Sequence, residues 1–205
     1  MSMVSRAVQV GAILIACLGS GCAFVDQKVP LAYQAPKASV QSSQGGNVSV
    51  EMPVCPEFGK NKKGLCIIGN VKNTYGMKTA DTVTADSVPK WIADAFSTEL
   101  QAAGFTPEIV DQLPSTAARG VSTRVIKVWV EQDPGFWTVG AIGEVQMRIT
   151  LYRAGRVVKT FDVESKGQGN RSMVGDAATK QESLRIALAT CMKETIPIMV
   201  ESFKE

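Results

Sequence analysis

Histidine is absent from this 205-residue sequence. Because histidine is the commonest general base and the commonest metal ligand in proteins, its absence argues against acid–base catalysis and against a metal centre. A strong net charge is also lacking, since 22 lysines and arginines face 19 aspartates and glutamates, for a net charge of +3. So small a surplus predicts neither a nucleic-acid partner nor strong electrostatic binding to a membrane. The composition therefore predicts a protein that is not an enzyme and that needs no cofactor.

The N-terminus lacks a hydrophobic run long enough to cross a membrane. Residues 7–16 are apolar except for Gln9 and Gly11, and Arg6 is the one charged residue before them. A transmembrane helix needs roughly 20 apolar residues to span a hydrocarbon core about 30 Å thick, so this run is too short. A basic residue, a short apolar run and small residues after it are typical of a signal peptide, which we assign to residues 1–21.

Two cysteines follow this run, and the residues before them resemble the lipobox of bacterial lipoproteins. In that motif a leucine-like residue and two small residues precede a cysteine that becomes acylated, and the chain is cleaved before it. Residues 14–17, which end at Cys17, have the leucine, whereas residues 19–22, which end at Cys22, have a glycine in its place but lie where the apolar stretch ends. We take Cys22 as the lipid attachment site and Cys17 as the alternative.

The resemblance to lipoproteins also implies a location. Stable attachment to a bilayer takes more than one acyl chain, and a multiply acylated cysteine meets that requirement. In Gram-negative lipoproteins an aspartate after the cysteine usually means retention in the inner membrane, whereas here Ala23 follows Cys22 and Leu18 follows Cys17. The resemblance therefore implies a lipid-anchored protein of the outer membrane that faces the periplasm.

The rest of the chain divides into a tether and one domain. Residues 22–46 are rich in proline, serine and glutamine, so we expect a flexible tether there, in which residues 29–33 could still dock as a strand. Residues 47–205 have the size of a single globular domain.

Hydrophobic periodicity predicts the first elements of that domain. Residues 48–52 and 65–71 have the apolar pattern of strands, and residues 72–85 are expected as a polar loop. A helix is expected to begin after Ser87, a capping residue, and to end at Gly104, which allows a left-handed stop.

The second half of the domain has a clearer pattern. Residues 105–110 predict a short edge strand, three strands between residues 121 and 164 alternate apolar and polar side chains, and a long helix covers residues 176–203, with Cys191 on its apolar side. The predicted fold is an α+β domain in the order β-α-β-β-β-β-α. It has a largely antiparallel sheet of four to five strands and two helices packed on one face.

This order of elements is similar to the YajG-like family of uncharacterised bacterial lipoproteins. The resemblance covers residues 60–205 and rests on the lipobox-like segment, the linker, the helix ending in the sequence FSTELQAAGF at residues 96–105, the hairpin and the long C-terminal helix. That family has no established activity, so the resemblance implies no catalytic residues.

Cys55 and Cys66 are the natural pair for a disulfide. They flank a turn-rich segment of ten residues, and outside the cytoplasm thiols can oxidise. A bridge closing so short a loop would stabilise the fold by up to about 3 kcal/mol. A zinc site is the poorer interpretation, because two cysteines in a chain without histidine make an incomplete ligand set.

A glycine-rich hairpin tip, residues 133–143, carries two large aromatic side chains, Phe136 and Trp137. If exposed, they form a patch that docks onto a partner or a membrane; alternatively, one of them folds back and covers the open end of the core. Other residues that could suggest chemistry have plainer explanations. We interpret the carboxylates Glu131, Asp133 and Glu144 as solvated charges, and the glycine-rich residues 166–175 as a flexible connection that lacks the signature of a phosphate-binding loop.

Two classes of function follow from these observations. The favoured class is a non-enzymatic envelope component that binds an unidentified periplasmic or outer-membrane protein or an envelope polymer. The alternative is a hydrolase of envelope material or a periplasmic protein that binds a small ligand, for which a deep apolar cavity between the sheet and the helices would be the sign.

Overall fold

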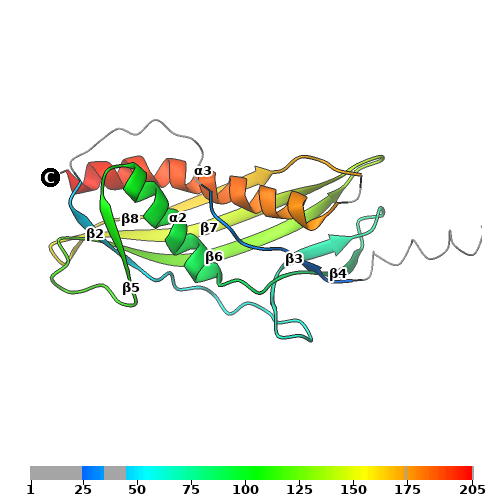
Figure 1. Ribbon diagram of the computed structural model, residues 1–205, viewed down its shortest axis with the longest axis horizontal. Coiled ribbons are helices and arrows are strands. Elements are labelled where there is room, and N and C mark those ends of the chain that lie inside the picture. The colour runs from blue at the N-terminus through cyan, green and yellow to red at the C-terminus, as the bar shows by residue number, and fades with distance from the viewer. Residues whose placement is uncertain (1–24, 35–44, 174, 205) are drawn as a thin grey trace, which may run out of the picture.

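The computed structural model describes residues 25–34, 45–173 and 175–204. These residues form an α+β domain, in which helices α2 (Val88–Ala102) and α3 (Ala177–Phe203) pack on the same face of an eight-stranded sheet (Figure 1). The predicted α+β class is therefore confirmed. No helix in the described part of the chain is long and apolar enough to span a membrane. The predicted signal peptide and both candidate acylated cysteines, Cys17 and Cys22, lie outside the described residues.

The sheet is mixed and larger than the sequence suggested. Its strands are β1 (Gln27–Lys28), β2 (Asn47–Glu51), β3 (Cys66–Lys72), β4 (Lys78–Thr84), β5 (Thr106–Val110), β6 (Arg119–Pro134), β7 (Val139–Arg153) and β8 (Arg156–Gln168). Strands β6, β7 and β8 form the expected antiparallel meander, and β3 and β4 are also antiparallel to each other. The pairs β1–β4, β2–β5, β2–β6 and β3–β6 are all parallel. The predicted number of four to five strands was therefore wrong, and the sheet is mixed, although most of its paired residues lie in antiparallel pairs.

The parallel pairs exist because β6 is much longer than its neighbours on one side. β6 has 16 residues, and β7 runs beside it along its whole length. Its other edge is shared by two short strands, β2 near Gly120 and Val121 and β3 near Val130 and Glu131. These partners are far away in the sequence, so nothing in their local pattern indicates the sense of the pairing.

Strand β4 replaces part of the polar loop that was expected at residues 72–85, which is a second correction. Thr82, Val83 and Thr84 are completely or almost completely buried. Branched side chains of this kind favour extended backbone, and threonine can be buried when its hydroxyl has a partner. Because this segment is polar, the sequence pattern did not predict that it forms a buried strand.

Helix α2 begins and ends where the sequence indicated. The hydroxyl of Ser87 accepts a hydrogen bond from the backbone N–H of Lys90 at 3.3 Å, and Pro89 lies in the first turn, where a missing N–H costs nothing. Gly104 has a φ of 89°, the left-handed conformation that glycine adopts freely. The buried face of the helix carries Trp91 and Phe96 into the core.

Helix α3 lies against β7 and β8 at glycines. A Cβ added to Gly167 would lie 2.2 Å from the carbonyl oxygen of Ser183, and one added to Gly143 would lie 2.6 Å from the same atom. A Cβ on Gly169 would lie 2.8 Å from the carbonyl oxygen of Thr179. Part of the segment expected as a flexible connection therefore belongs to β8 and to the surface on which α3 packs.

The segment 25–34 belongs to the folded unit, although the sequence assigned it to the tether. β1 pairs with β4, and the backbone N–H of Val29 donates to the carbonyl oxygen of Val83 at 2.8 Å. Val29 is fully buried, and the hydroxyl of Tyr33 donates to Glu99 on α2 at 2.5 Å. Residues 29–33 therefore dock as expected but not as a strand, because the strand is Gln27–Lys28. Residues 35–44 of the predicted tether lie outside the described residues.

Candidate docking site

Two turns lie together at one end of the sheet. Because β3 and β6 are parallel, with Asn70 beside Glu131, the turn after β3 and the turn after β6 lie at the same end of the molecule (Figure 1). Side chains fix this pairing: Gln132 donates from Nε2 to the carbonyl oxygen of Lys72 at 2.9 Å, and the Lys72 ammonium pairs with Glu131.

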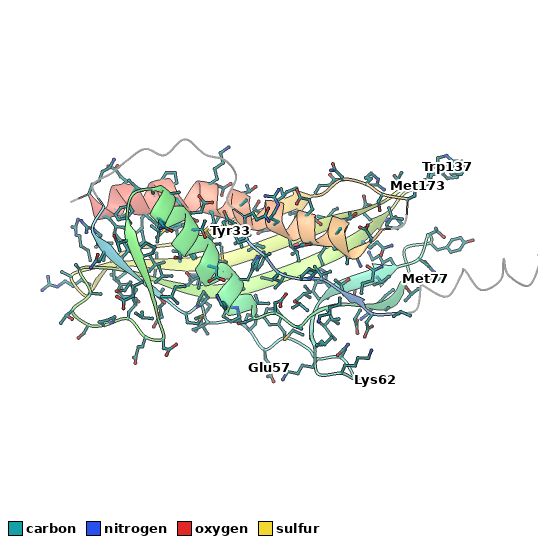
Figure 2. All side chains as sticks on the ribbon, in the orientation of Figure 1. Tyr33, Glu57, Lys62, Met77, Trp137 and Met173 are labelled. Atoms are coloured by element: carbon teal, nitrogen blue, oxygen red, sulfur yellow. The ribbon has the colours of Figure 1, made fainter. Side chains whose placement is uncertain are left out.

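The apolar side chains on these turns point into solvent. Phe136 is 90% exposed and Trp137 is 78% exposed, so neither covers the open end of the core, and that alternative was wrong. Their rings contact each other edge to face, with centroids 4.8 Å apart. We define the tip surface as the exposed side chains Tyr75, Met77, Phe136, Trp137 and Met173. Figure 2 shows the labelled Met77, Trp137 and Met173 at this same end of the molecule.

Arg171 fastens the aromatic turn to the segment that carries Met173. Its guanidinium donates to the carboxylate of Asp133 at 2.5 Å, to the Thr138 hydroxyl at 2.9 Å, and to the carbonyl oxygens of both residues. The backbones of Val139 and Ser172 exchange two further hydrogen bonds, of 2.7 and 2.9 Å. Phe136 and Trp137 therefore project from a turn that is held by Arg171 and by backbone hydrogen bonds, and not by the burial of the two aromatic side chains.

The described chain begins beside this end. Asp26 accepts a hydrogen bond from the backbone N–H of Asp81 at 3.0 Å and another from the Asn61 side chain at 2.9 Å. The bond from Asn61, followed by that from Asp81, lowers the pKa of the Asp26 carboxyl. β1 is parallel to β4, and Gln27 lies beside Thr82. The residues before Gln27 therefore lie beside the first half of β4, which begins next to the tip surface.

The three carboxylates considered as a catalytic set are all engaged in ion pairs. Glu131 pairs with Lys72, Asp133 with Arg171 at 2.5 Å and Glu144 with Lys127 at 2.8 Å. Among the residues that the structure describes, no group of three or more cysteine, aspartate or glutamate side chains is placed to hold a metal ion.

The three described cysteines are free thiols. Burial raises the pKa of Cys55 to about 12, and the nearby Cys66 adds to the rise. A bridge between these two half-buried residues stays a prediction. Cys191 is fully buried on α3, as expected; burial raises the pKa of this thiol to about 12, and its Sγ lies 3.6 Å from the carbonyl oxygen of Val145.

Lys180 is a buried cation that the sequence analysis missed. Its side chain is completely buried, and the ammonium donates to the Thr82 hydroxyl at 2.8 Å and to the Asn70 carbonyl oxygen at 3.2 Å. Burial lowers the pKa of Lys180 to about 8. Its position four residues before Leu184, on the apolar side of α3, was the signal that could have found it.

A cavity of about 450 Å³ lies between the N-terminal segment and the first turns of α3. Its lining includes Gln34, Asp176 and Arg185, and the Arg185 guanidinium makes two hydrogen bonds of 2.7 Å to Glu182. This polar lining differs from the deep apolar cavity that a small-ligand protein of this fold was expected to contain.

No family model matches the chain, and no curated protein matches it in sequence. Among solved structures, a DUF330 protein from Xanthomonas campestris is 13% identical, with a TM-score of 0.54, over 86% of this chain and 96% of that chain. The two proteins therefore share a fold. More distant similarities include a minor lipoprotein from Acinetobacter baumannii (8% identity, 76% of this chain and 93% of that chain, TM-score 0.42). Another is lipoprotein GNA1162 from Neisseria meningitidis (9% identity, 76% and 99%, TM-score 0.35).

Proposed function

We propose that this chain is a bacterial envelope lipoprotein that acts as a non-enzymatic binding component on the periplasmic side of the outer membrane. Acyl chains on Cys22, or on Cys17 in the alternative register, would hold it to the bilayer. The observation that carries the proposal is that two features lie at the same end of the domain. The large apolar side chains of the tip surface are exposed at the end of the domain where the chain arrives from Cys22.

Exposed aromatic clusters of this kind are typical of contact surfaces. Singly exposed apolar residues are ordinary, but a group that includes two adjacent aromatic rings marks a site of interaction. The binding partner would be a periplasmic or outer-membrane protein or an envelope polymer, in addition to the bilayer that holds the acyl chains. Membership of the YajG-like family stays a hypothesis, and the fold shared with the DUF330 protein supports only the architecture.

The alternative activities receive less support from the geometry. A hydrolase would use a carboxylate or a thiolate, yet Glu131, Asp133 and Glu144 are paired with cations, and the raised pKa of Cys55 and Cys191 keeps both thiols protonated near neutral pH. The one argument for a small ligand is the cavity beside Arg185, whose lining is polar.

Intact-mass measurement of protein extracted from bacterial membranes tests the proposed anchoring. We expect a mature chain that starts at Cys22 and carries added acyl mass. Cys22→Ala should keep the signal peptide and gain no acyl mass, whereas the matched control Cys17→Ala should be processed as wild type. An acylated chain starting at Cys17 would select the alternative register, and a mature chain without acyl mass would contradict the proposal.

Photo-crosslinking in intact cells tests the binding role. A photoreactive residue at Phe136 should give a specific crosslinked product with protein or with lipid, and one at Val157, also apolar and 58% exposed at the opposite end of the sheet, is the control. Equal products from both positions would argue against a defined contact at the tip.

A further inference from the structure

We propose that the tip surface docks into the interfacial layer of the same bilayer that holds the acyl chains, so that the domain stands on the membrane by this end. The inference deepens the proposed function and rests on acylation of Cys22. It identifies the occupant of the tip surface as lipid, through three features: the short distance from Cys22 to the domain, the kind of exposed side chain and the internal hydrogen bonds of the turns.

The short segment between Cys22 and the domain keeps the tip surface close to the membrane. Two residues, Ala23 and Phe24, lie between Cys22 and Val25, and an extended chain covers at most about 3.6 Å per residue, so the Cα atom of Cys22 lies within roughly 11 Å of the Cα atom of Val25. Asp26 is fixed to β4 by Asp81 and to the neighbouring loop by Asn61. The acylated cysteine therefore stays within about 11 Å of Val25, where the described chain begins beside the end that exposes the aromatic rings.

The exposed side chains at this end suit a membrane interface. Tryptophan and tyrosine concentrate at the level of the lipid headgroups, where their rings are partly apolar and their polar atoms meet water. Two cations next to the turns are neutralised by carboxylates, since Arg171 pairs with Asp133 and Lys72 pairs with Glu131. We therefore expect docking to depend on apolar contact and to change little with salt.

Both turns contain internal hydrogen bonds, which reduce the number of polar backbone groups that they present to a lipid interface. The backbone N–H of Gly135 donates to the carbonyl oxygen of Thr138, and that of Gly76 donates to the carbonyl oxygen of Asn73, both at 2.9 Å. The Asn73 side chain accepts from the backbone N–H groups of Tyr75 and Met77, both at 3.0 Å. These bonds hold the shape of the two turns without help from buried side chains of their own.

The test uses the full acylated protein, purified from membranes and reconstituted into vesicles of phosphatidylethanolamine and phosphatidylglycerol that contain brominated acyl chains. Bromine quenches tryptophan fluorescence only at short range. Of the three tryptophans, Trp91 is buried, Trp129 is half-buried on β6 and Trp137 is exposed at the tip. We expect Trp137→Phe to reduce the quenching at least threefold, whereas the matched control Trp129→Phe should preserve it, in low and in high salt.

The possible outcomes separate the docking from the anchoring. Vesicle flotation is measured on the same samples, and a wild-type protein that does not float with the vesicles would contradict the proposed acylation itself. A protein that floats but whose Trp137 is not quenched would overturn the docking alone. If in that case the photoreactive residue at Phe136 gives a crosslink to protein in cells, the occupant of the tip surface is a protein and not lipid.

Discussion

The tip surface and the interface between α3 and the sheet use their residues in opposite ways. At the interface, Gly143 and Gly167 bring the helix backbone so close to the strands that a single added methyl group has no room. At the tip, Phe136 and Trp137, two of the largest side chains in the chain, fill no space inside the protein. The comparison teaches that the fold depends on small residues at its centre and leaves its large exposed aromatics available for contact.

The largest expected effect comes from a substitution in the interface between α3 and the sheet. Gly167→Ala places a Cβ about 2.2 Å from the Ser183 carbonyl oxygen, so α3 must move away from β8. We expect a loss of about 3 kcal/mol in the free energy of unfolding, measured by denaturant titration. The matched control is Gly59→Ala, where the nearest atom lies 3.7 Å away and a change below about 0.5 kcal/mol is expected. Equal effects at the two positions would contradict the close packing.

A second prediction concerns the buried cation beneath α3. The pKa of Lys180 is about 8 in the folded protein, below its ordinary value of 10.5, so between these values the unfolded chain binds more protons and stability rises with pH. The rise should amount to about 2 kcal/mol from pH 8 to pH 10 and should disappear in Lys180→Met.

Unfolding titrations at several pH values measure this rise. Lys193→Met, an exposed position on the same helix, is the control and should retain it. An identical pH profile for wild type and Lys180→Met would show that Lys180 is not buried as a cation.

A third prediction tests whether residues 25–34 belong to the folded domain or to the tether. Tyr33→Phe removes the hydrogen bond to Glu99 and should cost about 1.5 kcal/mol near neutral pH. Burial and the bond to Glu99 raise the pKa of Tyr33 above its ordinary value of 10, so the wild type loses this stability as the pH rises above 10. The difference between wild type and variant should therefore shrink above pH 10, and a variant as stable as wild type near neutral pH would indicate that residues 25–34 are not docked.

The sequence predicted the elements whose signals are local. Helix α2 was located by a capping serine, a proline and a terminal glycine, and the meander of β6, β7 and β8 by alternation of apolar and polar residues. Helix α3 was recognised by its apolar side. These features depend on neighbouring residues, so they are visible without knowledge of the fold.

The features that the sequence did not predict depend on distant partners. β4 seemed a loop because its threonines are polar, and it is buried because Lys180, 98 residues away from Thr82, supplies a hydrogen-bond donor. The parallel sense of β2 and β3 is set by the opposite edge of β6, which no local pattern encodes. The exposure of Phe136 and Trp137 was one of two open alternatives, since it depends on how Arg171 holds the turn.

The central claim is that the tip surface exists for contact and contributes nothing to the fold. The most direct test is the free energy of unfolding of Phe136→Ser/Trp137→Ser, compared with wild type in a mature chain that also carries Cys22→Ser to remove the acyl chains. Because both rings are exposed, we expect the two values to agree within about 0.5 kcal/mol. A loss of more than about 2 kcal/mol would show that the aromatic pair belongs to the core and would contradict the account.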